Sequence, residues 1–376
     1  MKILIPTADY PPIEGGIATV ALQVSRELAR RGHDVTVVAP HFAGMEAFDR
    51  REGPRIVRFR GYGLGWFRFF PMLVAAWPYL RESDLILAIN IAYGGLLGWL
   101  AKRIWQRPYV GFAYAYEFLK FRRIAPFAWL LRRIYVGARV VVAISAYTRG
   151  RLVAFGVPNS KMAVVLPGAT PSEPCSAQTL ADVRAKFALD GSRVILAVGR
   201  FVARKGHVTL VRALPKIIAR FPNAVAVMVG RGPCMQVVTR EAMTLGVRDH
   251  IILPGRLADE EVAALYELCE VFALPTGARK GGQVEGFGLV FAECHAHGKP
   301  VVAGRSGGVV DAVLEGETGL LVEPEDSEAL SEAMISIMSD PAWARRLGEN
   351  GRRRVEAELN WSTFTERLLE EVEARA

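Results

Sequence analysis

Short apolar runs alternate with amphipathic segments along the whole chain. In the first half, the apolar runs that predict β-strands are Lys2–Ile5, Asp34–Ala39, Arg55–Phe59, Leu85–Ile89, Tyr109–Ala113, Val140–Ile144 and Met162–Leu166. Between the first two runs, apolar residues from Ile17 to Leu28 recur at helical spacing, and Gly32 follows the last of them. The pattern predicts a βαβ unit at the start of the chain.

The second half repeats this alternation after a break. Residues 169–190 contain Pro171, Pro174 and Asp190-Gly191, so this stretch predicts a linker. The strands expected beyond it are Val194–Val198, Ala224–Val229, Ile251–Leu253, Val271–Leu274, Pro300–Ala303 and Gly319–Val322. The helices expected between them are Val208–Arg220, Met235–Leu245, Glu260–Cys269, Gly288–His297 and Ser327–Met338.

Alternating strands and helices in both halves predict the fold class. We expect an α/β protein with two doubly wound Rossmann-like domains that face each other across a cleft. The N-terminal domain would span residues 1–168, the linker 169–190 and the C-terminal domain 191–355. A C-terminal helix would span 356–376, and its return to the N-terminal domain is one option. In such sheets ligands bind at the carboxyl ends of the strands.

The composition fits two globular domains and argues against several kinds of site. A chain of 376 residues with 51% hydrophobic residues can bury two cores. The four cysteines form no Cys-x-x-Cys pair, which indicates a reducing cytoplasm without disulfides or zinc. The histidines lack metal-ligand spacing and no Asp-x-Asp motif occurs, so we predict no metal and no cofactor. The apolar stretch at the N-terminus is too short for a signal peptide.

One uncharged segment, Leu85 to Ala101, has 17 residues, which is the lower limit for crossing a bilayer. Asn90, Tyr93 and three glycines divide it into a short strand and the start of a helix. This division favours a buried strand-helix unit over a membrane span.

Charge is distributed unevenly between the two halves. Residues 1–168 hold 23 Lys and Arg against 10 Asp and Glu, a net charge of +13, whereas the remainder carries −4. Much of the excess lies in two aromatic and basic tracts, Arg55 to Tyr79 and Phe118 to Tyr135. Such tracts suit an anionic membrane surface, and a solvated face over an ordinary helix core is the alternative. No nucleic-acid motif accompanies the charge, so we expect no nucleic-acid partner.

Three loops are expected at the carboxyl ends of strands. The first runs from Tyr10 to Gly16, the second from Gly199 to Gly206, and the third contains Glu285 and Glu293 at the start of a helix. Glycines and helix N-termini suit phosphates, cations neutralise a diphosphate, and carboxylates accept hydrogen bonds from sugar hydroxyls. Each loop alone is also explained by a structural turn or a solvated surface. The three together indicate a nucleotide sugar.

These motifs resemble the retaining glycosyltransferases of family 4, which have the GT-B fold. The residues that carry the resemblance are the Gly15-Gly16 loop, Ala143–Thr148, Gly199-Arg200 with Lys205-Gly206, Gly230–Pro233, the Glu285 and Glu293 pair, and Ser306–Gly308. The run from Leu274 to Gly308 is similar to bacterial mannosyltransferases that modify phosphatidylinositol mannosides.

The resemblance implies roles for individual residues. Arg200, Lys205 and Glu285 would be catalytic: the two cations would bind the donor diphosphate, and Glu285 would bind the donor sugar. Glu293 would hold the ribose hydroxyls. The remaining donor-binding residues would be Gly15, Gly16, Arg256, Leu257, Gly286, Phe287, Gly288 and Leu289. Tyr114 stands where many members have a histidine near the donor sugar, so a sugar contact is expected there.

The expected function is transfer of a sugar from GDP-mannose or a UDP-sugar to a lipid-linked or polysaccharide acceptor. The protein would be a metal-independent hexosyltransferase, peripheral on the inner face of the membrane, with variable acceptor loops around residues 60–80 and 114–125. The alternatives are an NAD-dependent oxidoreductase or a non-catalytic binding protein on the same fold. Gly230-Arg231-Gly232 lacks the third glycine of a dinucleotide-binding motif, which weakens the oxidoreductase alternative.

Overall fold

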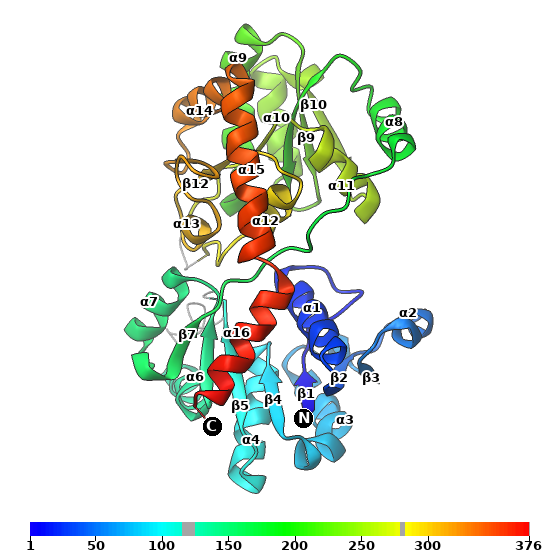
Figure 1. Cartoon of the computed structure of the whole chain (residues 1–376), viewed down its shortest axis with the longest axis vertical. Coiled ribbons are helices and arrows are strands. Elements are labelled where there is room, and N and C mark those ends of the chain that lie inside the picture. The colour runs from blue at the N-terminus through cyan, green and yellow to red at the C-terminus, as the bar shows by residue number, and fades with distance from the viewer. Residues whose placement is uncertain (115–124, 279–282, 376) are drawn as a thin grey trace. The chain divides into compact units, whose positions relative to one another are not determined.

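The computed structural model describes residues 1–114, 125–278 and 283–375. The chain forms two compact units (Figure 1). The N-terminal unit consists of Met1–Pro167 together with Trp361–Ala376, and the C-terminal unit consists of Gly168–Asn360.

The N-terminal unit contains a seven-stranded parallel sheet in the order β3-β2-β1-β4-β5-β6-β7. Its strands are β1 (Lys2–Pro6), β2 (Asp34–Pro40), β3 (Arg55–Phe59), β4 (Leu85–Ala88), β5 (Tyr109–Ala113), β6 (Val140–Ala143) and β7 (Met162–Val164). The chain starts at the central β1, runs outward to β3 and then returns to β4. Because parallel crossovers are right-handed, this reversal places helices on both faces, and the predicted doubly wound architecture is confirmed.

The helices of this unit pack on the sheet through apolar faces. They are α1 (Gly16–Arg30), α2 (Glu46–Arg51), η1 (Tyr62–Arg68), α3 (Phe69–Glu82), η2 (Ile91–Gly95), α4 (Leu96–Trp105), α6 (Ala125–Gly137), α7 (Ala146–Phe155), η3 (Asn159–Lys161) and α16 (Trp361–Glu373). The last helix packs against α1, and Arg31 Nη2 donates to the carbonyl of Ser362 at 2.9 Å. The C-terminal helix therefore completes the N-terminal unit.

The uncharged segment from Leu85 to Ala101 forms β4, η2 and most of α4. The Asn90 side chain accepts from the backbone N–H of Tyr93 and starts the turn between strand and helix. The prediction of a buried strand-helix unit is confirmed. Among the described residues, no helix combines the length and the apolar character needed to cross a bilayer.

The C-terminal unit contains a six-stranded parallel sheet in the order β10-β9-β8-β11-β12-β13. Its strands are β8 (Arg193–Val198), β9 (Ala224–Val229), β10 (Ile251–Gly255), β11 (Val271–Leu274), β12 (Val301–Gly304) and β13 (Gly319–Val322). Its helices are α8 (Ala177–Lys186), η4 (Ala203–Lys205), α9 (His207–Arg220), α10 (Met235–Thr244), η5 (Arg248–His250), α11 (Asp259–Leu268), α12 (Leu289–Ala296), α13 (Val309–Ala312), α14 (Ser327–Ser339) and α15 (Pro341–Ala357). The predicted strands lie within two residues of those observed.

Helix α8 lies inside the stretch that the prolines predicted as a linker. Its N-cap, Ser176, accepts from the backbone N–H of Thr179 at 3.0 Å. The helix packs against α11, and Lys186 forms an ion pair with Glu261 of that helix. Pro171 and Pro174 precede the helix and do not interrupt it. The segment therefore contributes a helix that packs on the C-terminal unit.

Candidate active site

The carboxyl ends of the parallel strands form one edge of the C-terminal sheet. Two glycines let the loops at this edge approach each other closely. A Cβ at Gly206 (φ 75°) would overlap the carbonyl oxygen of Pro275, and one at Gly307 (φ 59°) would overlap that of Glu285. Only glycine fits both the left-handed backbone and the close approach. The backbones of the loops after β8, β11 and β12 therefore pack directly against one another.

Glu285 lies at the centre of a buried ion cluster. Lys205 Nζ is 2.9 Å from Glu285 Oε2, and Arg204 Nη1 donates to the same oxygen. The side chains of Lys205, Glu285 and Arg204 are 9%, 14% and 16% exposed. Burial raises the pKa of Glu285, but the charges of Lys205 and Arg204 outweigh it and lower the pKa to about 2. The cluster therefore holds two cations and one carboxylate, with a net positive charge.

The second cation of this cluster differs from the one predicted. Arg200 follows β8 at the same sheet edge, but its side chain is exposed and makes no ion pair with any described residue. Arg204 takes the place beside Glu285, because the short η4 turn carries Arg204 and Lys205 together and the N–H of Gly277 holds the Arg204 carbonyl at 2.8 Å. The structure brings Lys205 and Glu285 together as expected and leaves Arg200 outside the cluster.

Glu293 lies in the second turn of α12. The helix begins after Gly288, whose φ of 92° is left-handed, and Phe287 is buried just before it. Tyr266 donates its hydroxyl to Glu293 Oε2 at 3.1 Å. Burial raises the pKa of Glu293, and the Tyr266 hydrogen bond and the Lys205 charge offset part of this rise. Tyr266 lies on α11, and nothing in the sequence pattern linked it to Glu293.

Each of the two carboxylates keeps one oxygen available. The hydrogen bonds and ion pairs of Glu285 and Glu293 all use Oε2, and within the described parts of the chain Oε1 of each has no hydrogen-bond partner. An ionised carboxylate oxygen accepts hydrogen bonds and cannot donate them. The backbone N–H groups at the start of α12, from Gly286 to Leu289, can donate hydrogen bonds to an anion, and the two carboxylate oxygens can accept them from hydroxyl groups.

Arg256 and Leu257 follow β10 at the same sheet edge. Arg256 is exposed and Leu257 half-buried. Strand β9 separates β10 from β8, and the N–H of Gly230 at the end of β9 donates to the Gly255 carbonyl at 2.8 Å. Arg256 and Leu257 therefore lie at the same end of the sheet as the loop after β8 that carries Arg204 and Lys205, with β9 between the two loops.

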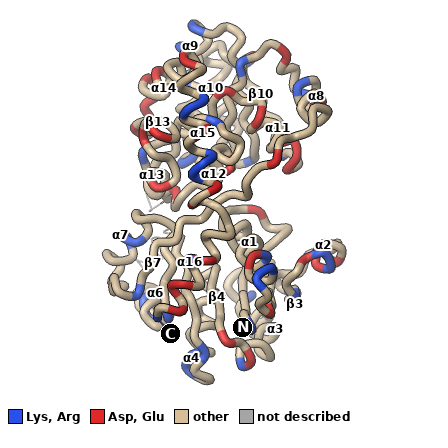
Figure 2. The backbone as a smooth tube through the Cα atoms, in the orientation of Figure 1, with Lys and Arg blue, Asp and Glu red and all other residues tan. Residues whose placement is uncertain are grey.

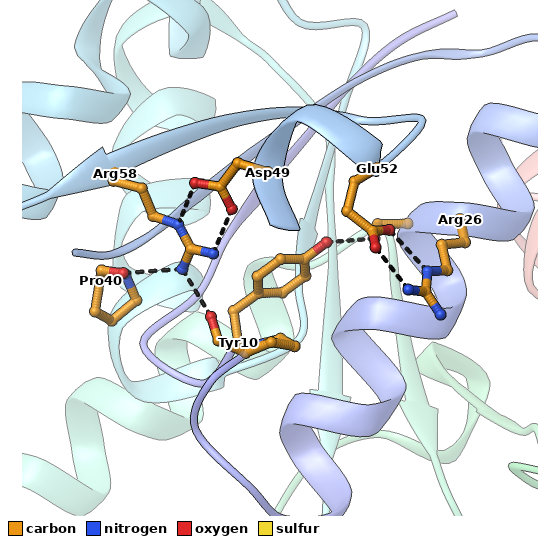
Figure 3. A network of polar contacts seen from close by, with 8 residues as sticks. Tyr10, Arg26, Pro40, Asp49, Glu52 and Arg58 are labelled. Atoms are coloured by element: carbon orange, nitrogen blue, oxygen red, sulfur yellow. Dashed lines mark hydrogen bonds and ion pairs between the residues drawn. The ribbon is translucent and has the colours of Figure 1, made fainter. Parts of the chain in front are cut away.

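In the N-terminal unit, Gly15 and Gly16 start α1 after a loop that is anchored at its other end. Arg58 donates to the Pro11 and Pro40 carbonyls at 2.8 and 2.9 Å and holds Asp49 with two hydrogen bonds, while Tyr10 shares a 3.1 Å hydrogen bond with Ser25 (Figure 3). A Cβ at Gly15 would meet no atom within 4 Å. The anchored loop thus presents an open glycine at a helix N-terminus.

Tyr114 lies half-buried at the end of β5, on the same edge of the N-terminal sheet as the Gly15-Gly16 loop. Sequence reasoning missed a pair at this edge: Asn90, after β4, donates its amide to Asp9, after β1. Burial raises the pKa of Asp9, and the Asn90 hydrogen bond lowers it in part. Lys120, Arg122 and Arg123 of the second aromatic and basic tract lie outside the described residues.

The residues that the structure describes include no group of three or more His, Cys, Asp or Glu side chains placed to hold a metal ion. His295 shares a 3.0 Å hydrogen bond with the Thr318 carbonyl, and His297 stacks on Tyr266. Both histidines therefore serve the packing of α12. Metal independence stays a prediction.

Two family models match the chain: Glycosyltransferase Family 4 over residues 14–173, and Glycosyl transferases group 1 over residues 181–354. The GDP-mannose-dependent alpha-(1-6)-phosphatidylinositol monomannoside mannosyltransferase of Mycolicibacterium smegmatis is 33% identical over 381 residues, covering 99% of this chain and 98% of the relative. The chain belongs to glycosyltransferase family 4. The enzyme of the same description from Mycobacterium tuberculosis is 32% identical over 396 residues, covering 98% of this chain and 97% of the relative.

Solved structures agree on the fold of this glycosyltransferase. The Anabaena protein Alr3699/HepE in complex with UDP and glucose superposes with a TM-score of 0.82 at 20% identity, covering all of both chains. Glycosyltransferases of the GT-B type share this pair of doubly wound domains, so the predicted fold class and the predicted hexosyltransferase activity are confirmed. The oxidoreductase and binding-protein alternatives find no support.

Proposed function

We propose that this glycosyltransferase moves mannose from GDP-mannose to a phosphatidylinositol-type lipid, with retention of the anomeric configuration and without a metal. The observation that carries the proposal is the ion cluster of Arg204, Lys205 and Glu285, whose two cations exceed its carboxylate by one charge. Surplus positive charge in a largely buried place suits a departing diphosphate. The identity of the donor and the acceptor is supported by the names of the mannosyltransferases that match the full length.

The diphosphate would bind to Lys205, Arg204 and the backbone amides at the start of α12. The exposed side chain of Arg200 would contact the diphosphate as well. Glu285 Oε1 would accept a hydrogen bond from a mannose hydroxyl, and Glu293 Oε1 one from the ribose. Arg256 and Leu257 would flank the base, and the donor contacts expected for Gly15, Gly16 and Tyr114 stay a prediction.

The chemical step breaks the bond between the mannose C1 and the β-phosphate oxygen. A bond from C1 to the acceptor hydroxyl oxygen forms on the same face, the departing phosphate takes the acceptor proton, and GDP is released. The protein supplies no nucleophile in this step. Lys205 and Arg204 stabilise the charge that grows on the phosphate, and Glu285 positions the sugar.

An exposed apolar surface on η1 and α3 supports attachment to a membrane, where a lipid acceptor is found. Its members are Leu64, Trp66, Phe67, Phe70, Val74 and Trp77, which are 49–74% exposed. On α3, Phe70, Val74 and Trp77 share one face, while Met72, Ala76 and Leu80 are buried on the other. Arg68 lies over the rings of Tyr62 and Tyr93. Aromatic rings with cations suit the interface of an anionic bilayer.

The test is a comparison of donors and acceptors with the purified enzyme. Product formation would be followed with GDP-mannose, UDP-glucose and UDP-galactose, each offered with phosphatidylinositol monomannoside and with free mannose, in the presence of EDTA. We expect mannosylated lipid from GDP-mannose alone, with the α-anomeric configuration of the donor. Transfer from a UDP-sugar in preference to GDP-mannose, or an inverted product, would contradict the proposal.

A further inference from the structure

A basic pocket opens at the amino ends of β5, β6 and β7 in the N-terminal unit. It has a volume of about 340 Å³. Residues from five segments line it: Lys102, Gln106, Pro108, Arg139, Ser160, Lys161 and Arg375. Pro108, Arg139 and Lys161 each stand directly before a strand. The Gly15-Gly16 loop and Tyr114 stand at the carboxyl ends of the same sheet, so the pocket is separate from the residues assigned to the donor.

Among the described residues, the lining holds four cations and no carboxylate. Lys102 Nζ donates to the Gly137 carbonyl at 2.7 Å, and Lys161 Nζ lies 3.2 Å from the Ala138 carbonyl. These two bonds fix the ammonium groups at the α6–β6 turn and leave each of them further N–H donors. Figure 2 shows the basic residues of α4 and those beside α6 as blue segments.

The charges in this pocket are poorly compensated. Arg139 forms no ion pair with any residue in the described ranges, and Arg375 pairs with Glu371 one turn earlier on α16. Burial, and then the positive charges of Lys161, Arg139 and Arg103, lower the pKa of Lys102. The part of this lowering that comes from the other cations is repulsion, which an anion in the pocket would relieve.

We propose that this pocket binds a phosphate monoester, a dianion whose oxygens would accept from Lys102, Arg139, Lys161 and Arg375. Guanidinium and ammonium groups from separate segments converge here as they do around phosphates in other proteins. The phosphate would come either from a small soluble molecule or from the headgroup of an anionic lipid. The protein would then have a second anion-binding site in addition to the donor site.

The experiment is a calorimetric titration of the full chain with inorganic phosphate at constant ionic strength. The test variant is Arg139→Gln with Lys161→Gln, because neither side chain pairs with a carboxylate in the described structure. The matched control is Arg50→Gln with Arg51→Gln on the exposed α2, which removes the same charge from the same unit. Lys205→Ala distinguishes phosphate binding in the basic pocket from phosphate binding at the donor site. Circular dichroism melting establishes that each variant folds.

We expect phosphate binding to weaken about tenfold or more in the test variant and to persist in the α2 control and in Lys205→Ala, because charge-assisted hydrogen bonds are lost only in the first. Arg139→Lys should retain most of the binding. A lipid source would be shown by pocket-dependent binding to phosphatidylcholine vesicles containing phosphatidic acid and weak binding of free phosphate. Equal losses in the test variant and the α2 control, or no binding of either probe, would overturn the proposal.

Discussion

Lys205 Nζ lies 2.9 Å from Glu285 Oε2, although 80 residues separate the two in the chain. The contact joins the η4 turn after β8 to the loop that precedes α12. Gly206 and Gly307 make it possible, because each lets the backbone of one loop pass close to the backbone of another. A shared oxygen then binds two cations and leaves the second oxygen of Glu285 for a ligand.

Glu285→Gln should destabilise the C-terminal unit and change its response to acid. Near neutral pH we expect a loss of about 3–5 kcal/mol, because the variant leaves two largely buried cations without their carboxylate. The folded pKa of Glu285, about 2, lies below its ordinary value of 4.5. The stability that Glu285 contributes is therefore complete above about pH 4.5 and is lost as the pH falls toward 2.

Urea denaturation of the wild type and of Glu285→Gln at several pH values measures this difference. The gap between the two proteins should be largest near neutral pH and should narrow in acid. Glu328→Gln is the control, since Glu328 pairs with Lys216 on the surface and should cost at most about 1 kcal/mol. A gap that stays constant down to about pH 3 would show that the ion cluster does not hold the pKa of Glu285 low.

Gly307→Ala should cost more stability and more activity than Gly316→Ala. Both glycines have a left-handed φ, 59° and 71°, so both variants bear a backbone strain of about 1–2 kcal/mol. A Cβ at 316 meets no atom within 4 Å, whereas one at 307 overlaps the Glu285 carbonyl and adds about 1–3 kcal/mol. Thermal melting and turnover of the two variants separate strain from crowding. Similar losses in both would mean that the close approach does not position Glu285.

Phe67→Ser with Val74→Ser should weaken binding to anionic vesicles by about tenfold or more, because two exposed apolar side chains no longer reach the bilayer interface. Val237→Ser with Met243→Ser on α10 removes a similar exposed apolar area from the C-terminal unit and should change nothing. Vesicle sedimentation is the measurement. Equal binding by both double variants and the wild type would remove η1 and α3 from the account of membrane attachment.

The strands and most helices could be predicted because each depends on a local apolar pattern. Helix α9 was expected from Val208 and begins at His207, and α12 was expected from Gly288 and begins at Leu289. The sequence could not show that Arg204, and not Arg200, pairs with Glu285, because this depends on how Gly206 packs against Pro275 of a loop distant in the sequence. The same holds for Tyr266 beside Glu293. It also holds for the basic pocket, whose cations come from α4, from the residues just before β6 and β7, and from Arg375 after the end of α16.

Turnover of Lys205→Ala compared with that of Lys216→Ala tests the central claim most directly. Lys216 pairs with Glu328 and Glu332 on the surface of the same unit, so its loss removes an equal charge far from the proposed chemistry. We predict that Lys205→Ala folds and loses about 100-fold or more in kcat, as expected when a group that stabilises the departing phosphate is removed. Lys216→Ala should keep wild-type turnover. Folded Lys205→Ala with wild-type kcat on GDP-mannose would contradict the assignment of this ion cluster as the catalytic centre.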